Sequence, residues 1–195
     1  MPEVELPNPE EIKEKAEDPF TRQVALFVAV YAVALAITAL GGNNAGKEMI
    51  MAQQKATNQW SYYQAKVVRE NLYLLEAEKI DLQLETDGGG LSADARKRLE
   101  QVRHKYRHKA EEYTHEKHEI KEKAEDLEKE RDLNSRKDPY FDYAEALLQI
   151  AIVLASVAML SGKKWPFWTS LAMAGIGLVL CVNGFALLVK VPGLE

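Results

Sequence analysis

Three long apolar stretches, separated by a strongly charged middle segment, constrain the fold of this chain more than any other feature. They run from Val24 to Leu40, from Ala144 to Leu160 and from Trp165 to Leu188. A helix needs roughly 17–25 mainly apolar residues to cross the hydrocarbon core of a bilayer, and each stretch is in or near this range. The sequence therefore predicts an all-α integral membrane protein with three transmembrane helices.

The charged segment from Lys47 to Asp138 contains nearly equal numbers of basic and acidic residues, whereas Val24–Leu40 contains no charge. Most of the net charge of −5 comes from the first 22 residues, so the charge does not indicate nucleic acid or another charged partner. The single cysteine, Cys181, lies in the third stretch and cannot form an intrachain disulfide. Cysteine usage therefore leaves the compartment open.

Prolines, glycines and composition divide the chain into five predicted segments. Asn8-Pro9-Glu10-Glu11 is typical of the start of a short helix, which Asp18-Pro19 would stop. Gly41–Asn44 permits a bend after the first span, and Asp138-Pro139 is expected to end the second helix of the hairpin. The predicted segments are an acidic N-terminal segment (1–22), a transmembrane helix (23–41), a soluble helical hairpin with its turn at 86–91 (45–138), and two closing transmembrane helices (143–161 and 165–189).

Two apolar patterns at helical spacing predict that the charged segment is a long antiparallel hairpin that forms a coiled coil. The first helix carries a wide apolar face, enough for more than one neighbour. The second carries a narrower stripe typical of a coiled-coil seam. We therefore expect apolar surface to be left over for self-association or for another membrane protein. The first-helix face comprises Ala65, Val68, Leu72, Leu75 and Leu82 with a neighbouring stripe of Trp60, Tyr63, Val67 and Leu74; the second-helix stripe comprises Ala95, Leu99, Val102, Tyr106, Ala110, Tyr113, Ile120, Ala124 and Leu127.

Small residues recur at spacings of three and four within each apolar stretch. Helices in lipid associate through close backbone approach across small side chains, so these stripes are predicted packing or oligomer faces. A seven-residue period of this kind favours left-handed packing. The stripes are Ala25, Ala29, Ala32 and Ala36 in the first span; Ala151, Ala155 and Ala158 in the second; and Gly177, Cys181 and Gly184 in the third.

Short basic segments give an expected orientation. Three spans alternate across the bilayer, so the first 22 residues and the Lys163-Lys164 loop share a side. Lysine and arginine in short loops favour the cytoplasm, whereas long loops cross largely regardless of charge. We therefore expect a cytoplasmic N-terminus and an extracytoplasmic hairpin.

The four histidines form one stripe on the second hairpin helix. His104, His108, His115 and His118, with Glu111 between them, follow spacings of four and three. Histidines one turn apart can share a zinc, copper or nickel ion or respond to pH. The stripe lies about opposite the seam on a helical wheel of 3.6 residues per turn, so a solvated polar face is the simpler interpretation. Metal binding here is the alternative, and we expect no cofactor.

Polar groups near the spans offer a third hypothesis. Glu145 and Gln149 lie one turn apart at the start of the second span, and Asn183 lies in the third. Such groups are functional candidates in a membrane, here for a channel or transporter component. The sequence contains no phosphate-binding glycine loop and no convincing nucleophile–base pair. We therefore expect no enzymatic activity.

The stretch Gln59-Trp60-Ser61-Tyr62-Tyr63-Gln64-Ala65-Lys66 resembles an uncharacterised bacterial membrane family, a domain of unknown function. The resemblance covers essentially the whole chain and implies a bacterial membrane location, without implying an activity, ligand or catalytic residue. The leading hypothesis is a homo-oligomeric membrane scaffold assembled through its hairpin and its small-residue faces. An accessory or sensory module that binds metal or protons through the histidines is the alternative, and a channel component a further one.

Overall fold

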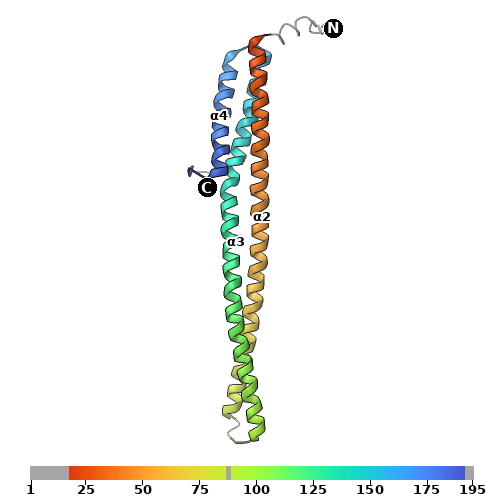
Figure 1. Ribbon diagram of the computed structural model, residues 1–195, viewed down its shortest axis with the longest axis vertical. Coiled ribbons are helices and arrows are strands. Elements are labelled where there is room, and N and C mark those ends of the chain that lie inside the picture. Colours follow the sequence, from red (N-terminus) through yellow and green to blue (C-terminus); the bar gives the residue numbers. More distant parts are fainter. Residues whose placement is uncertain (1–17, 87–88, 192–195) are drawn as a thin grey trace, which may run out of the picture. The chain divides into compact units, whose positions relative to one another are not determined.

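The computed structural model describes residues 18–86 and 89–191, which fold as three helices (Figure 1). They are α2 (Pro19–Thr86), α3 (Ala93–Ser161) and α4 (Lys164–Ala186). The chain divides into two compact units: unit 1 comprises Met1–Glu48 and Leu133–Glu195, and unit 2 comprises Met49–Asp132. Each helix contains a stretch that is long and apolar enough to cross a membrane.

Helix α2 begins at the Asp18-Pro19 pair. The backbone N–H of Phe20 and the hydroxyl of Thr21 each donate to the Asp18 carboxylate at 3.4 Å. Proline suits the first helical position because its missing N–H would have no partner there. The short helix expected before this point lies outside the described residues.

Helix α2 continues without a break through Gly41–Asn44, where the sequence permitted a bend. The two glycines are positions of close helix contact in unit 1. A Cβ atom added to Gly41 would lie 2.6 Å from Phe141 Cε1, and one at Gly42 would lie 3.1 Å from Phe141 Cβ. Glycine costs a helix roughly 1 kcal/mol, and the packing of Phe141 against this bare backbone offsets that cost.

The expectation that Asp138-Pro139 ends the second hairpin helix is wrong, because Pro139 lies inside α3. An internal proline removes a backbone hydrogen bond and costs about 3 kcal/mol. The next two side chains, Tyr140 and Phe141, are almost fully buried in unit 1. The Tyr140 hydroxyl also donates to the Val189 carbonyl at 3.3 Å and accepts the Val191 N–H at 3.1 Å. The packing of Tyr140 and Phe141 therefore outweighs the tendency of Pro139 to end the helix.

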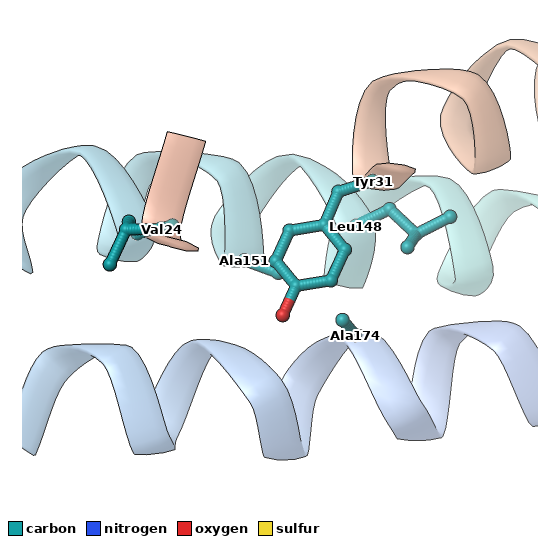
Figure 2. Packing of buried hydrophobic residues seen from close by; sticks show 6 residues of the cluster. Val24, Tyr31, Leu148, Ala151 and Ala174 are labelled. Carbon is teal, nitrogen blue, oxygen red and sulfur yellow. The ribbon is translucent and has the colours of Figure 1, made fainter. Parts of the chain in front are cut away.

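In unit 1 all three helices pack around small side chains (Figure 2). The Tyr31 ring of α2 lies between Ala151 of α3 and Ala174 of α4, and all three residues are buried. The Ser170 hydroxyl donates to the Ala151 carbonyl at 2.8 Å, which binds α4 directly to the α3 backbone. Helix α4 ends at Ala186, before the end predicted at residue 189. The next residue, Leu187, adopts a left-handed backbone conformation.

Unit 2 is a two-helix antiparallel hairpin, as the sequence predicted. Ser92 caps α3 by accepting the Ala95 N–H at 3.2 Å. The predicted α3 stripe faces α2, and Ala110, Ile120 and Ala124 are buried. The side chains that α2 contributes to the contact, however, are not its most apolar ones. They follow spacings of four and three or their sums, and they include Ala52, Ala56, Tyr63, Lys66, Glu70, Tyr73, Ala77 and Ile80.

Candidate interaction surface

Helix α2 of unit 2 presents an uncovered apolar stripe, here called the α2 stripe. Val68, Leu72, Leu75 and Leu82 are 58%, 55%, 49% and 57% exposed, and Ala65 is also exposed. Their positions follow spacings of three and four, with Lys79 at the one interrupted position. These residues are one of the two neighbouring stripes that the sequence assigned to the apolar face of the first hairpin helix, and α3 leaves them exposed.

The α2 stripe lies nearly opposite the side of α2 that contacts α3. Both sets of residues repeat every seven positions, and at 100° per residue their centres are roughly 160° apart around the helix. One helix therefore carries two seams, of which the α3 contact occupies one. Apolar exposure on this scale in a charged unit makes the α2 stripe a candidate interaction surface.

The exposed face of α3 is different. Among the described residues of unit 2, Val102 is the one large apolar side chain of α3 that is markedly exposed, at 38%. The corresponding exposed side chains of α2 are Ile50, Met51, Tyr62, Val68, Leu72, Leu74, Leu75 and Leu82. The exposed large apolar side chains of unit 2 therefore belong mainly to α2.

Two charged residues take the inward positions that more apolar residues could have filled. Lys66 donates to the Glu116 carboxylate, which raises the pKa of Lys66 against the opposing effect of burial. Its ammonium group also lies 4.8 Å from the centre of the Tyr113 ring. These contacts hold a buried charge that would otherwise be costly, and they fix the alignment of α2 against α3.

Glu70 forms the second polar layer. Burial raises the pKa of its carboxyl, but hydrogen bonds from Lys117 and Thr114 outweigh burial and hold the pKa below its usual range. The Thr114 hydroxyl donates at 2.8 Å. Neither Lys66 nor Glu70 was predicted to face α3. The 4-3 spacing that runs from Ala56 through Tyr63 to Tyr73 includes both residues and places them on the inner face of α2.

Trp60 and Tyr63 take part in packing within unit 2. The Trp60 indole donates to the Glu128 carboxylate at 2.9 Å, and its ring contacts Tyr63 edge to face at 5.6 Å between centroids. Their positions in the hairpin support a structural role for the Trp/Tyr-Tyr stretch.

The histidine stripe lies on the exposed face of α3. His104, His108, His115 and His118 are all exposed. His108 Nδ1 lies 3.2 Å from a Glu112 oxygen, and His118 Nε2 lies 3.6 Å from a Glu122 oxygen, both within the same helix. In residues 18–86 and 89–191, no group of three or more histidine, cysteine, aspartate or glutamate side chains is arranged to hold a metal ion.

The three small-residue stripes occupy different environments in unit 1. The stripes of the second and third spans lie between helices. A Cβ atom added to Gly177 would lie 3.2 Å from the Ala144 carbonyl oxygen, so glycine at this position allows α4 to approach α3 closely. The stripe of the first span lies on an exposed side of α2. The buried residues are Ala151, Ala155, Ala158, Gly177, Cys181 and Gly184, and the exposed ones are Ala25, Ala29, Ala32 and Ala36.

The polar residues near the spans contact neighbours on their own segment. The Gln149 amide donates to the Glu145 carboxylate at 3.1 Å across one helical turn. Asn183 binds both backbone groups of Val189, at 2.8 Å and 2.9 Å, and so holds the chain that follows α4. The Asn183 contacts explain this side chain structurally.

The described residues define an all-α protein with a two-helix hairpin, a third apolar helix and three candidate membrane spans. Residues 20–187 match the model of a family described as a domain of unknown function, DUF4337, and the chain belongs to this family. No curated protein and no solved structure matches the sequence.

Proposed function

We propose that this protein is a non-enzymatic membrane scaffold that associates with further copies of itself through its hairpin and its spans. The observation that carries the proposal is the uncovered α2 stripe in an otherwise charged hairpin. Apolar side chains at coiled-coil spacing stabilise a protein when a second helix removes them from water.

Membrane insertion is supported by the surface of unit 1. Its outward side chains are large and apolar on each helix, for example Leu26 at 67% and Val153 at 61% exposure. Water would make this surface costly, whereas lipid would cover it without penalty. The bacterial inner membrane, with a cytoplasmic N-terminus, is the location that we propose.

A structural role is also supported by the charges of unit 2. The shifted pKa values of Lys66, Glu70 and Asp81 arise from pairs that join α2 to α3. Ion pairs that align helices perturb pKa values without any catalytic purpose. The exposed histidines likewise lack the enclosing groups that a bound metal normally requires.

The proposal is tested by measuring the mass of the full chain extracted in mild detergent or in native nanodiscs. We expect a defined oligomer and retention in the membrane fraction after alkaline extraction. A chain that stays monomeric at micromolar concentration contradicts self-association. Release of the chain into water without detergent contradicts membrane anchoring.

A further inference from the structure

We propose that the α2 stripe pairs with the same stripe of a second copy, with the two α2 helices running in the same direction. This inference rests on the proposed membrane scaffold and names the surface, partner and alignment of its association. The pair would join two hairpins into an arrangement of four helices, with α2 and its counterpart in the centre.

The spacing of the α2 stripe assigns its residues to the two core positions of a coiled coil. Ala65, Leu72 and Lys79 recur every seven residues, and Val68, Leu75 and Leu82 form the second such set. In a parallel pair each residue meets its own counterpart, so leucine faces leucine in three layers. The remaining layers contain alanine, valine and lysine. A single lysine at such a position selects alignment and oligomer size at a cost in stability.

The acids beside Lys79 reduce the cost of placing two lysines close together. The Lys79 ammonium already donates to the Glu76 carboxylate at 2.7 Å. Glu78 is the neighbouring residue on the other side of the stripe. A pair of copies would therefore surround two ammonium groups with four carboxylates, which offsets the repulsion between the two lysines.

The residues along the edges of the α2 stripe are compatible with parallel pairing. Edge residues of a parallel coiled coil meet those five positions later on the partner. The resulting neighbours are Gln64 with Arg69, Asn71 with Glu76, and Glu78 with Gln83. Each charged side chain meets an amide, so no like charges are opposed.

The direction of pairing follows from insertion into one bilayer. The proposed first span and the α2 stripe belong to the same uninterrupted helix. Copies that insert with the same topology carry the hairpin on the same side of the bilayer, and we expect their α2 helices to run in the same direction. Opposite pairing would align Leu72 with Leu75 and Val68 with Lys79.

Cysteine crosslinking in native membranes tests this pairing, using the full chain with Cys181→Ala as background. Val68→Cys and Leu82→Cys should each form a disulfide-linked dimer under mild oxidation, because a disulfide requires Cα atoms within about 7 Å. Leu74→Cys is the matched control: Leu74 is 46% exposed and adjacent to Leu75, but points about 100° away from it. We expect Val68→Cys and Leu82→Cys to crosslink roughly tenfold faster than the control.

Other outcomes overturn the pairing and separate it from the proposed function. Crosslinking of Leu82→Cys chains only to Ala65→Cys chains, and not to one another, would show opposite directions. Equal crosslinking at Leu74→Cys would show an unspecific collision. An oligomer by mass without crosslinks at the α2 stripe would overturn this pairing and leave the scaffold intact. A monomer would overturn both, and crosslinks to a different protein would replace the second copy by that partner.

Discussion

Glu70 and Lys117 show how single charged residues stabilise a coiled coil that is only partly apolar. The Glu70 side chain is 11% exposed and the Lys117 side chain 25%. Burying a charge costs free energy unless a partner compensates, so the value of each residue depends on the other. Removing one member should therefore be worse than replacing both.

Glu70→Ala should lower the free energy of unfolding by about 1–3 kcal/mol, because it leaves Lys117 partly buried without its carboxylate. Replacement of both residues by leucine should recover most of this loss. Denaturant unfolding of the full chain in detergent, followed by circular dichroism, measures both variants. Equal destabilisation by the single and double replacements would contradict the account.

The pKa of Asp138 in unit 1 is shifted in the opposite direction to that of Glu70. Partial burial, with the nearby Asp142 carboxylate, raises the pKa of Asp138 above its ordinary value of 3.8. The ionised carboxyl therefore destabilises the folded state at neutral pH, and this penalty disappears as the pH falls through the raised pKa.

Asp138→Asn should increase the free energy of unfolding at pH 7, by up to about 1 kcal/mol. The gain should shrink at low pH, where the native aspartate is itself neutral. Asp142→Asn is the matched comparison and should give a smaller gain, because Asp142 is exposed and contributes only repulsion. Thermal unfolding at pH 7 and pH 4 gives the comparison, and a loss of stability in Asp138→Asn at pH 7 would disprove the sign.

At the scale of helices, glycines control how closely α2 can approach its neighbours in unit 1. A Cβ at Gly41 would lie within 3 Å of the Phe141 and Phe185 rings, whereas a Cβ at Gly175 would meet nothing within 4 Å. Both glycines lie inside helices. The pair therefore separates close packing from helix propensity.

Gly41→Ala should destabilise the protein by about 1–2 kcal/mol, because overpacking outweighs the gain in helix propensity. Gly175→Ala should be neutral or stabilising by up to about 1 kcal/mol. The temperature at which each full-length variant loses its elution peak in detergent provides the measurement. A stabilised Gly41→Ala variant would show that the Phe141 contact is not close in solution.

The helical composition and the hairpin could be predicted from periodicity, because seven-residue patterns are local and repeated. The inner face of α2 was not predicted, although the 4-3 spacing from Ala56 to Tyr73 indicates it, because a neighbouring stripe is more apolar. Leu72 and Leu75 make the stronger apolar stripe, yet α3 packs against Lys66 and Glu70, whose partners Glu116 and Lys117 come from a distant part of the sequence. Pro139 was misread for a related reason: a local helix breaker lost to the tertiary packing of the side chains that follow it.

The candidate surface was therefore found in part. The sequence indicated surplus apolar area on the first hairpin helix, and the structure places that surplus on Val68, Leu72, Leu75 and Leu82. It also places the histidines on the outer face that the helical wheel predicted. Whether the exposed alanines of the first span, Ala29 and Ala32 among them, form an oligomer face stays a prediction.

At the scale of the whole molecule, the two units should respond to acid in opposite directions. In unit 2 the pKa of Asp81 is held low by hydrogen bonds from Arg103 and Arg107, and that of Glu70 by Lys117 and Thr114. A lowered carboxyl pKa stabilises the folded state above the ordinary pKa, and this stabilisation is lost as the pH falls through the lowered value. In unit 1 the same fall in pH stabilises the folded state, because protonation of Asp138 removes the cost of its buried charge.

Acidification from pH 7 should therefore weaken unit 2 first, beginning below about pH 4.5, the ordinary pKa of glutamate. Trp60 reports on unit 2, and Trp165 and Trp168 report on unit 1. Variants that retain only Trp60 or only the other pair allow each unit to be followed by fluorescence in detergent. We expect the Trp60 signal to change at higher pH, and Glu70→Gln, which cannot ionise at this position, to flatten the acid response of unit 2. Coincident transitions at both sites, unaffected by Glu70→Gln, would show that the carboxylates joining α2 to α3 do not govern the acid stability of the hairpin.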